Sequence, residues 1–126
     1  MRSIVVCCLL LSSLTANAGS WVYVTTTEDG IKFYVQGTKK KGAIVTTWVL
    51  NDFQNKQYVG SISYKSNAMK MIFDCNEETF TVKSVITYNE LNAKGGVVSS
   101  DDYIDDTRKS IPPNSTWQAV MTFVCK

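Results

Sequence analysis

Residues 69–75 read Met-Lys-Met-Ile-Phe-Asp-Cys, and the predicted fold depends on their alternation. Side chains of a strand point to opposite faces in turn, so Met69, Met71, Phe73 and Cys75 share one apolar face. Residues 76–78 are polar and favour a turn, and residues 79–88 return as a second alternating run. The two runs are therefore predicted to pair as an antiparallel hairpin.

The rest of the chain repeats this pattern in short runs rich in Val, Ile, Thr, Tyr and Phe, which favour strands with one buried face. Further strands are predicted at residues 21–27, 31–36, 43–53 and 97–100, and the segment 58–68 is not divided by its pattern. Between the strands, residues 37–42 (GTKKKG) are predicted as a basic loop, polar residues 51–57 as a connection, and residues 101–110 as an irregular segment.

The chain changes character after Pro112-Pro113, which ends any strand. Ser115 and Gln118 have the spacing of a capping box, in which their side chains satisfy free backbone N–H groups at a helix start. A helix is predicted from about 115 to 125, with one apolar stripe formed by Trp117, Val120, Met121, Val124 and Cys125. Cys75 and Cys125 thus both point into an interface between a sheet face and this helix. The sequence predicts an α+β, mostly β domain with one antiparallel sheet and a C-terminal helix.

The first 18 residues have the features of a secretory signal peptide. Arg2 supplies the positive charge, residues 4–14 form an apolar run, and Ala16-Asn17-Ala18 fits a cleavage site before Gly19. The apolar run is too short to span a bilayer. The alternative is a lipid anchor on Cys7 or Cys8, but Val6 and the short preceding apolar run fit a lipoprotein signal poorly. We therefore expect a signal peptide at 1–18 and one exported domain at 19–126.

Two cysteines, Cys75 and Cys125, remain after that cleavage. In an oxidising compartment such a pair most often forms a disulfide, here predicted to add about 4 kcal/mol of stability. The alternatives are two free thiols or a cysteine nucleophile. The nucleophile would lack its usual base, because the chain contains no histidine.

The charge balance limits the classes of partner. Without Arg2, twelve basic residues stand against eleven acidic ones. This near-neutral balance argues against general capture of nucleic acid, which needs a concentrated basic surface. The later apolar stretches are strand-sized, so no transmembrane segment is predicted after the leader.

An ordered set of short matches runs through the domain, and with it the chain resembles the surface-adhesin protein E family of Gram-negative bacteria. No single motif is specific, and the ordered set with its paired cysteines carries the resemblance. The matching residues are Trp21-Val22, Asp29-Gly30, Phe33-Tyr34-Val35, 39–45, Thr47-Trp48-Val49-Leu50, Asp74-Cys75, Tyr88, Gly95-Gly96, Ile111-Pro112-Pro113 with Ser115, and Val124-Cys125-Lys126.

The resemblance implies a sheet of about six antiparallel strands, with the helix tethered to one face by a Cys75–Cys125 disulfide. It also implies a surface-exposed protein that binds host matrix or serum proteins such as vitronectin or laminin. One departure is that the adhesin that names the family is a lipoprotein, whereas this leader lacks a convincing lipobox. The predicted location is therefore the periplasm, the cell surface or the medium.

Few residues stand out as candidate partner-binding positions. Lys39, Lys40 and Lys41 could contact acidic or sulfated groups, although a solvated loop between strands is the more common role of such a run. Trp21 is predicted to be partly exposed and available to a partner, since aromatic residues dominate interfaces. Trp48 and Trp117 fall on apolar stripes and are predicted to be core. Tyr23, Tyr34 and Tyr88 are assigned to no face.

Other polar patterns have simpler interpretations. The run Asp101, Asp102, Asp105 and Asp106 departs from calcium-loop spacing and favours a solvated loop with Arg108 and Lys109 nearby. The sequon at Asn114 fits helix capping better than glycosylation. An acid–base pair such as Asp74 with Glu77 is conceivable, but nothing in the sequence places it in a pocket.

The sequence therefore predicts a non-enzymatic binding protein without a cofactor or metal. The alternatives are a periplasmic protein that binds or modulates another envelope protein and, third, a hydrolase that uses carboxylates. A homodimer is compatible with an exposed sheet edge.

Overall fold

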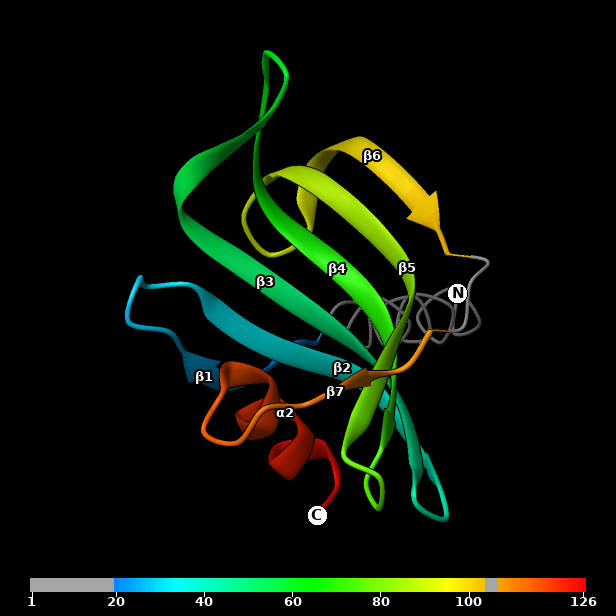
Figure 1. Ribbon diagram of the computed structural model, residues 1–126. Helices are drawn as coiled ribbons and strands as arrows, with labels where there is room; N and C mark the ends of the chain where they lie inside the picture. The colour runs from blue at the N-terminus through cyan, green and yellow to red at the C-terminus, as the bar shows by residue number, and fades with distance from the viewer. Residues whose placement is uncertain (1–19, 104–106) are drawn as a thin grey trace, which may run out of the picture.

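The computed structural model describes residues 20–103 and 107–126, and it forms one antiparallel sheet with a helix against it (Figure 1). The strands follow one another as a meander in the order β1 to β6. Their bounds are β1 Val22–Thr26, β2 Lys32–Lys41, β3 Ile44–Val59, β4 Ile62–Asp74, β5 Thr79–Glu90 and β6 Lys94–Asp102. A short strand β7, Lys109–Ser110, also pairs with β5, and α2, Thr116–Val124, ends the fold. The predicted six-stranded antiparallel sheet with a C-terminal helix is confirmed.

One face of the sheet, here called the helix face, carries the main apolar core. Val35, Val49 and Met69 stand opposite one another on β2, β3 and β4, and so share this face. Val120, Met121 and Val124 of α2 pack into the same cluster. The other buried apolar members are Phe33, Val45, Met71, Phe73 and Ile111. Burial of this cluster drives the association of helix and sheet, because apolar area removed from water is stabilising.

The helix is fixed at both ends. At its start, the Ser115 hydroxyl accepts a hydrogen bond from the Gln118 N–H at 3.2 Å, as the capping box predicts. The return bond differs, because the Gln118 side-chain oxygen accepts from the N–H of Asn114 rather than of Ser115. At its end, the predicted disulfide joins Cys75 to Cys125, with their Cα atoms 6.0 Å apart. The disulfide ties the helix to the end of β4.

Several predicted boundaries were wrong, all because strands extend through polar sequence. Of the predicted loop 37–42, residues 37–41 are strand, since β2 continues to Lys41 and pairs with β3, and only Gly42 lies in the turn. Residues 51–57 are not a connection, since β3 runs on to Val59. The last long strand covers Lys94–Asp102 rather than 97–100, and β7 lies within the segment predicted as irregular. The predicted signal peptide, with Cys7 and Cys8, lies outside the described residues.

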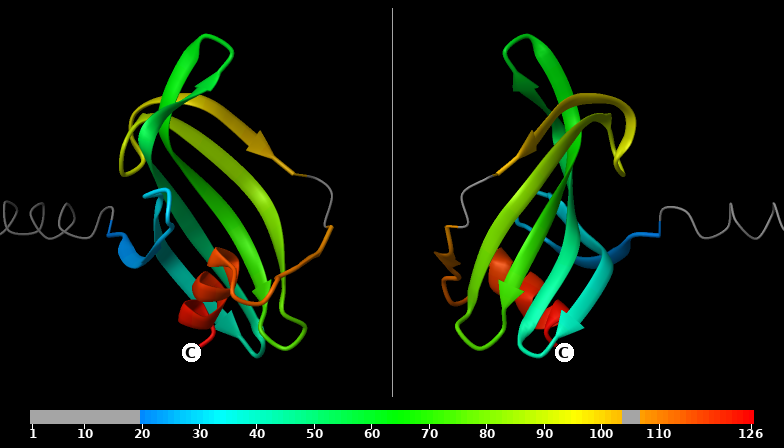
Figure 2. Two further views of the ribbon diagram at one scale, coloured as in Figure 1. Left: turned by 60° about the vertical axis from the view of Figure 1, so that its left-hand side comes forward. Right: turned by 90° about the vertical axis from the view of Figure 1, so that its right-hand side faces the viewer.

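The long strands β3 and β4 twist strongly, and their hairpin extends past the body of the sheet (Figure 2). β2 pairs with β3 only as far as Lys32 and Asp52, and β5 begins to pair with β4 at Ser66 and Tyr88. Residues 57–64, here called the distal ribbon, therefore pair only with each other within the described residues. Gly60 is the first residue of its two-residue turn and has the positive φ of 62° that a type II′ turn needs there.

Candidate functional site

The three candidate lysines are the last residues of β2, next to the β2–β3 turn. Lys39 stands opposite Thr46, Lys40 opposite Val45 and Lys41 opposite Ile44. Residues directly opposite each other on paired strands share a face. Lys40 therefore shares the helix face with Val45, whereas Lys39 and Lys41 share the opposite face, here called the far face. All three side chains are exposed.

The far face holds a groove of about 200 Å³, here called the aromatic groove. Trp21 borders it just before β1, and Trp48 and Tyr88 border it from β3 and β5. The groove is lined by Trp21, Gln36, Trp48, Ala68, Ile86 and Tyr88. Trp21 is half-buried, which fits the prediction that it is partly exposed.

The prediction that Trp48 lies in the core was wrong, and the same prediction for Trp117 is correct only in part. Trp48 is half-buried on the far face rather than in the core, because it alternates with Thr47 and Val49, which point to the helix face. Trp117 packs at the margin of the core, with its ring 5.5 Å from that of Phe33 and 5.4 Å from that of Phe80. Apolar alternation identified both positions but could not say which face the helix covers.

Gln36 is the amide residue of this groove, and the sequence did not single it out. Its side-chain oxygen is buried and accepts no hydrogen bond within the described part of the chain. A buried carbonyl oxygen without a donor is costly, so a donor brought by a partner would relieve that cost. The only sequence signal was its place on β2 with Tyr34, on the face opposite to Phe33 and Val35.

The groove and the lysines are neighbours along β2. Gln36 lines the groove, and Lys39 and Lys41 follow three and five residues later on the same face. At the rise of a strand this places them roughly 10–17 Å from Gln36 along β2. The structure thus brings Trp21 and two of the three candidate lysines to one face, and it places Lys40 on the other.

A second candidate site, which is polar, surrounds Asp52 on β3. Asp52 is only 6% exposed, and its carboxylate accepts the backbone N–H of Asn92 at 2.8 Å. Its neighbour Ser66 accepts the N–H of Ala93 at 3.1 Å and donates to the Glu90 carbonyl oxygen. These bonds hold the β5–β6 turn against β3 and β4. A pocket of about 300 Å³ beside them is lined by Gly30, Lys32, Tyr34, Asp52, Phe53, Gln54, Leu91 and Asn92.

Burial raises the pKa of Asp52 above 3.8, while the Asn92 N–H and the charge of Lys32 lower it by less. The folded protein therefore binds this proton more tightly than the unfolded chain does. The contribution of Asp52 to stability is largest below the unfolded pKa and declines as the pH rises through the folded pKa.

Asp52→Asn tests this linkage, because an amide oxygen can still accept the Asn92 N–H but no longer titrates. We expect the free energy of unfolding of the wild type, relative to the variant, to fall as the pH rises from about 3 to about 7. Urea denaturation at a series of pH values measures the difference. Asp101→Asn, at an exposed position on β6, controls for the loss of one negative charge. A difference between wild type and Asp52→Asn that stays constant with pH would contradict the raised pKa.

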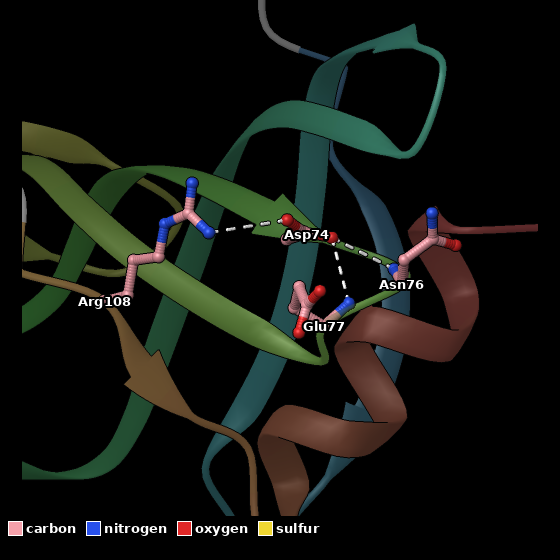
Figure 3. A network of polar contacts seen from close by, with 4 residues as sticks. All are labelled: Asp74, Asn76, Glu77 and Arg108. Atoms are coloured by element: carbon pink, nitrogen blue, oxygen red, sulfur yellow. Dashed lines mark hydrogen bonds and ion pairs between the residues drawn. The ribbon is translucent and has the colours of Figure 1, made fainter.

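Asp74 organises the turn between β4 and β5 rather than an acid–base pair (Figure 3). Its carboxylate accepts the backbone N–H groups of Asn76 at 3.1 Å and Glu77 at 3.0 Å. Arg108 lies 3.7 Å from its second oxygen, and because the arginine is exposed this ion pair adds little stability. Asp74 and Glu77 therefore act together as turn residues, and the geometry gives no support to the hydrolase hypothesis.

The acidic run gives no metal site within the described residues, where no group of three or more Cys, Asp or Glu side chains is close enough to hold an ion. Asp102 instead accepts the Ser84 hydroxyl at 2.9 Å, and Arg108 pairs with Asp74 rather than with Asp101 or Asp102. Asp105 and Asp106 lie outside the described residues. No helix in residues 20–103 and 107–126 is long and apolar enough to cross a membrane.

Comparisons with known proteins agree on one family and one fold. The family model described as surface-adhesin protein E matches residues 21–126. No curated protein matches the chain. Crystal form II of Haemophilus influenzae protein E is similar over 86% of this chain and 88% of its own, with 14% identity and a TM-score of 0.63. A second structure of that protein covers 86% and 85%, at 14% identity and a TM-score of 0.61. Protein E from non-typeable Haemophilus influenzae covers 86% and 76%, at 15% identity and a TM-score of 0.58.

Proposed function

Because the chain belongs to the surface-adhesin protein E family, we propose that it is an exported, non-enzymatic adhesin that binds host matrix or serum proteins such as vitronectin or laminin. The observation that carries the proposal is the far face, where Trp21 and Trp48 border the aromatic groove and Lys39 and Lys41 lie beside it. Half-buried aromatic side chains next to exposed cations are typical of the centre and rim of a protein-binding surface.

The two parts of the far face have different roles in this proposal. The aromatic groove receives an apolar side chain of the partner, preferably one with an N–H or O–H group that donates to the buried oxygen of Gln36. Lys39 and Lys41 attract an acidic or sulfated part of the same partner. Charges at the rim mainly raise the rate of association and its dependence on salt. Cleavage before Gly19 then places this face outside the inner membrane.

Binding of purified residues 19–126 to a panel of immobilised matrix and serum proteins, at rising salt, tests the proposal. We expect saturable binding to one or two of them, weakened by salt because exposed charges are screened. Binding to none of the panel would contradict the adhesin proposal and favour the alternative, a periplasmic protein that binds another envelope protein. Labelling of the protein on intact cells separates these two locations.

Paired variants test which face binds. We expect Lys39→Gln with Lys41→Gln to weaken binding by on the order of tenfold, and Trp21→Ala to weaken it by more than about 30-fold. Lys40→Gln is the control for the face, because it removes one positive charge from the helix face and should leave the affinity within about twofold. Equal effects of the Lys40 and the Lys39/Lys41 changes would place the contact away from the far face.

A further inference from the structure

The distal ribbon exposes apolar side chains at a place that no other strand of residues 20–103 and 107–126 covers. At its tip Tyr58 is 64% exposed, Val59 53% and Ile62 55%. Val59 and Ile62 stand opposite each other and share one side of the ribbon, and Tyr58 lies on the other. A two-stranded ribbon gains little stability on its own, so exposed apolar residues here do not serve the fold. Figure 1 shows that the β3–β4 hairpin projects beyond the other strands, so its tip presents these apolar residues away from the sheet.

The ribbon stands on a rigid base. Phe53 of β3, which comes before the ribbon, meets Tyr64, the last residue of the ribbon on β4, edge to face with their rings 5.8 Å apart. Below them, β3 and β4 are held by β2 and β5 on either side. The tip is therefore presented by the body of the sheet, and Gly60 of its turn faces open space: apart from its chain neighbours, no atom of the described residues lies within 4 Å of a Cβ placed there.

The charged residues of the hairpin that carries the distal ribbon are all basic between residues 53 and 73. Residues 53–73 contain Lys56, Lys65 and Lys70 and no acidic residue. Lys56 and Lys65 come just before and just after the distal ribbon, and neither forms an ion pair with another described residue. Glu90, at the end of β5, stands opposite Lys94. An apolar tip with lysines set back from it matches an anionic lipid surface, in which apolar groups enter the interface and cations remain at the headgroups.

We propose that the distal ribbon docks the protein on an anionic phospholipid membrane. Tyr58, Val59 and Ile62 enter the headgroup region, and Lys56 and Lys65 contact lipid phosphates. The three residue pairs of the ribbon span roughly 10 Å, close to the depth at which interfacial segments lie. The ribbon does not reach the hydrocarbon core, because the unpaired backbone groups along its two edges need water or headgroups. This docking is separate from the protein-binding far face.

Co-sedimentation of the exported protein with lipid vesicles tests the proposal. We expect binding to vesicles of phosphatidylcholine mixed with phosphatidylglycerol and little binding to phosphatidylcholine alone. Val59→Ser with Ile62→Ser should weaken binding by at least about tenfold through lost apolar burial. Lys56→Gln with Lys65→Gln should weaken it by about 30-fold, since each lysine near an anionic surface contributes on the order of fivefold. Val97→Ser is the control, because Val97 is 58% exposed but lies on β6.

Three results would overturn the proposal. The first is a wild type that does not bind phosphatidylglycerol vesicles even at low salt. The second is binding that survives both sets of ribbon variants, which would place the lipid contact elsewhere. The third is a set of ribbon variants that keep lipid binding but lose binding to a matrix or serum protein, which would make the ribbon a protein contact. Unchanged circular dichroism and thermal melting of the variants show that the fold is intact.

Discussion

Removal of the disulfide by Cys75→Ser with Cys125→Ser is expected to lower the free energy of unfolding by about 4 kcal/mol. The two cysteines are 50 residues apart, and the cross-link restricts the unfolded chain by an amount that grows with that separation. Natural domains of this size have a net stability of only about 5–15 kcal/mol, so the loss is a large share of it. Urea denaturation of the oxidised proteins measures the change.

The wild type with reductant is the control for this double variant. It should lose about the same free energy, since reduction opens the same loop without changing any other side chain. The double change avoids leaving a single free thiol, which could form mixed disulfides. Free thiols at both positions in the unreduced wild type, found by mass spectrometry, would contradict the tether between β4 and α2.

Replacement of Phe73 by alanine is expected to destabilise the protein by about 3–5 kcal/mol. Phe73 is fully buried on β4, where it stands between Val45 of β3 and Phe80 of β5, and its ring lies 6.4 Å from that of Phe80. The change removes apolar contacts and leaves a cavity beneath α2 that the sheet cannot close without shifting. Chemical denaturation and differential scanning calorimetry measure the loss.

Two further variants calibrate this result. Phe73→Leu keeps most of the apolar volume and should cost less than about 1.5 kcal/mol. Val97→Ala, at an exposed position of β6, should change stability by no more than about 0.5 kcal/mol. A small loss for Phe73→Ala would mean that the helix face is not a closed core.

The parts of the fold that the sequence predicts correctly are those where one face of an element is apolar. Residues 69–75 alternate with period two and the stripe from Trp117 to Cys125 recurs at helical spacing, so their strand and their helix follow from local pattern. The pairing of Cys75 with Cys125 follows instead from their being the two cysteines left after the predicted cleavage, in an oxidising compartment. The same reasoning fails for the polar run 51–57, which it predicts as a connection, and for Lys39 to Lys41, which it predicts as part of a loop. Lys39 to Lys41 belong to β2 because they pair with β3, and residues 51, 52 and 57 of β3 pair with β4. Register shifts after Gln36 and Asp52 interrupt the alternation.

Only part of the candidate site could be predicted from the sequence, for two physical reasons. Alternation separates the two faces of a strand but does not tell which face a helix covers. The pattern therefore predicts Trp48 in the core, whereas the structure places it on the far face. The role of Asp52 depends on Asn92, 40 residues further on, whose turn folds back over β3. No short-range pattern encodes a contact of that separation.

The meander makes the assembly of this protein strongly directional. Each strand from β2 to β6 pairs with the strand before it, so a chain that emerges with its amino terminus first can add strands one at a time. Val120, Met121, Val124 and Cys125, which close the helix face, come after every strand. Until they arrive, Phe33, Val45 and Phe73 face the surroundings, because the helix residues that cover them are not yet in place. The interval between emergence of β5 and emergence of α2 is therefore the period in which the chain is most exposed to aggregation.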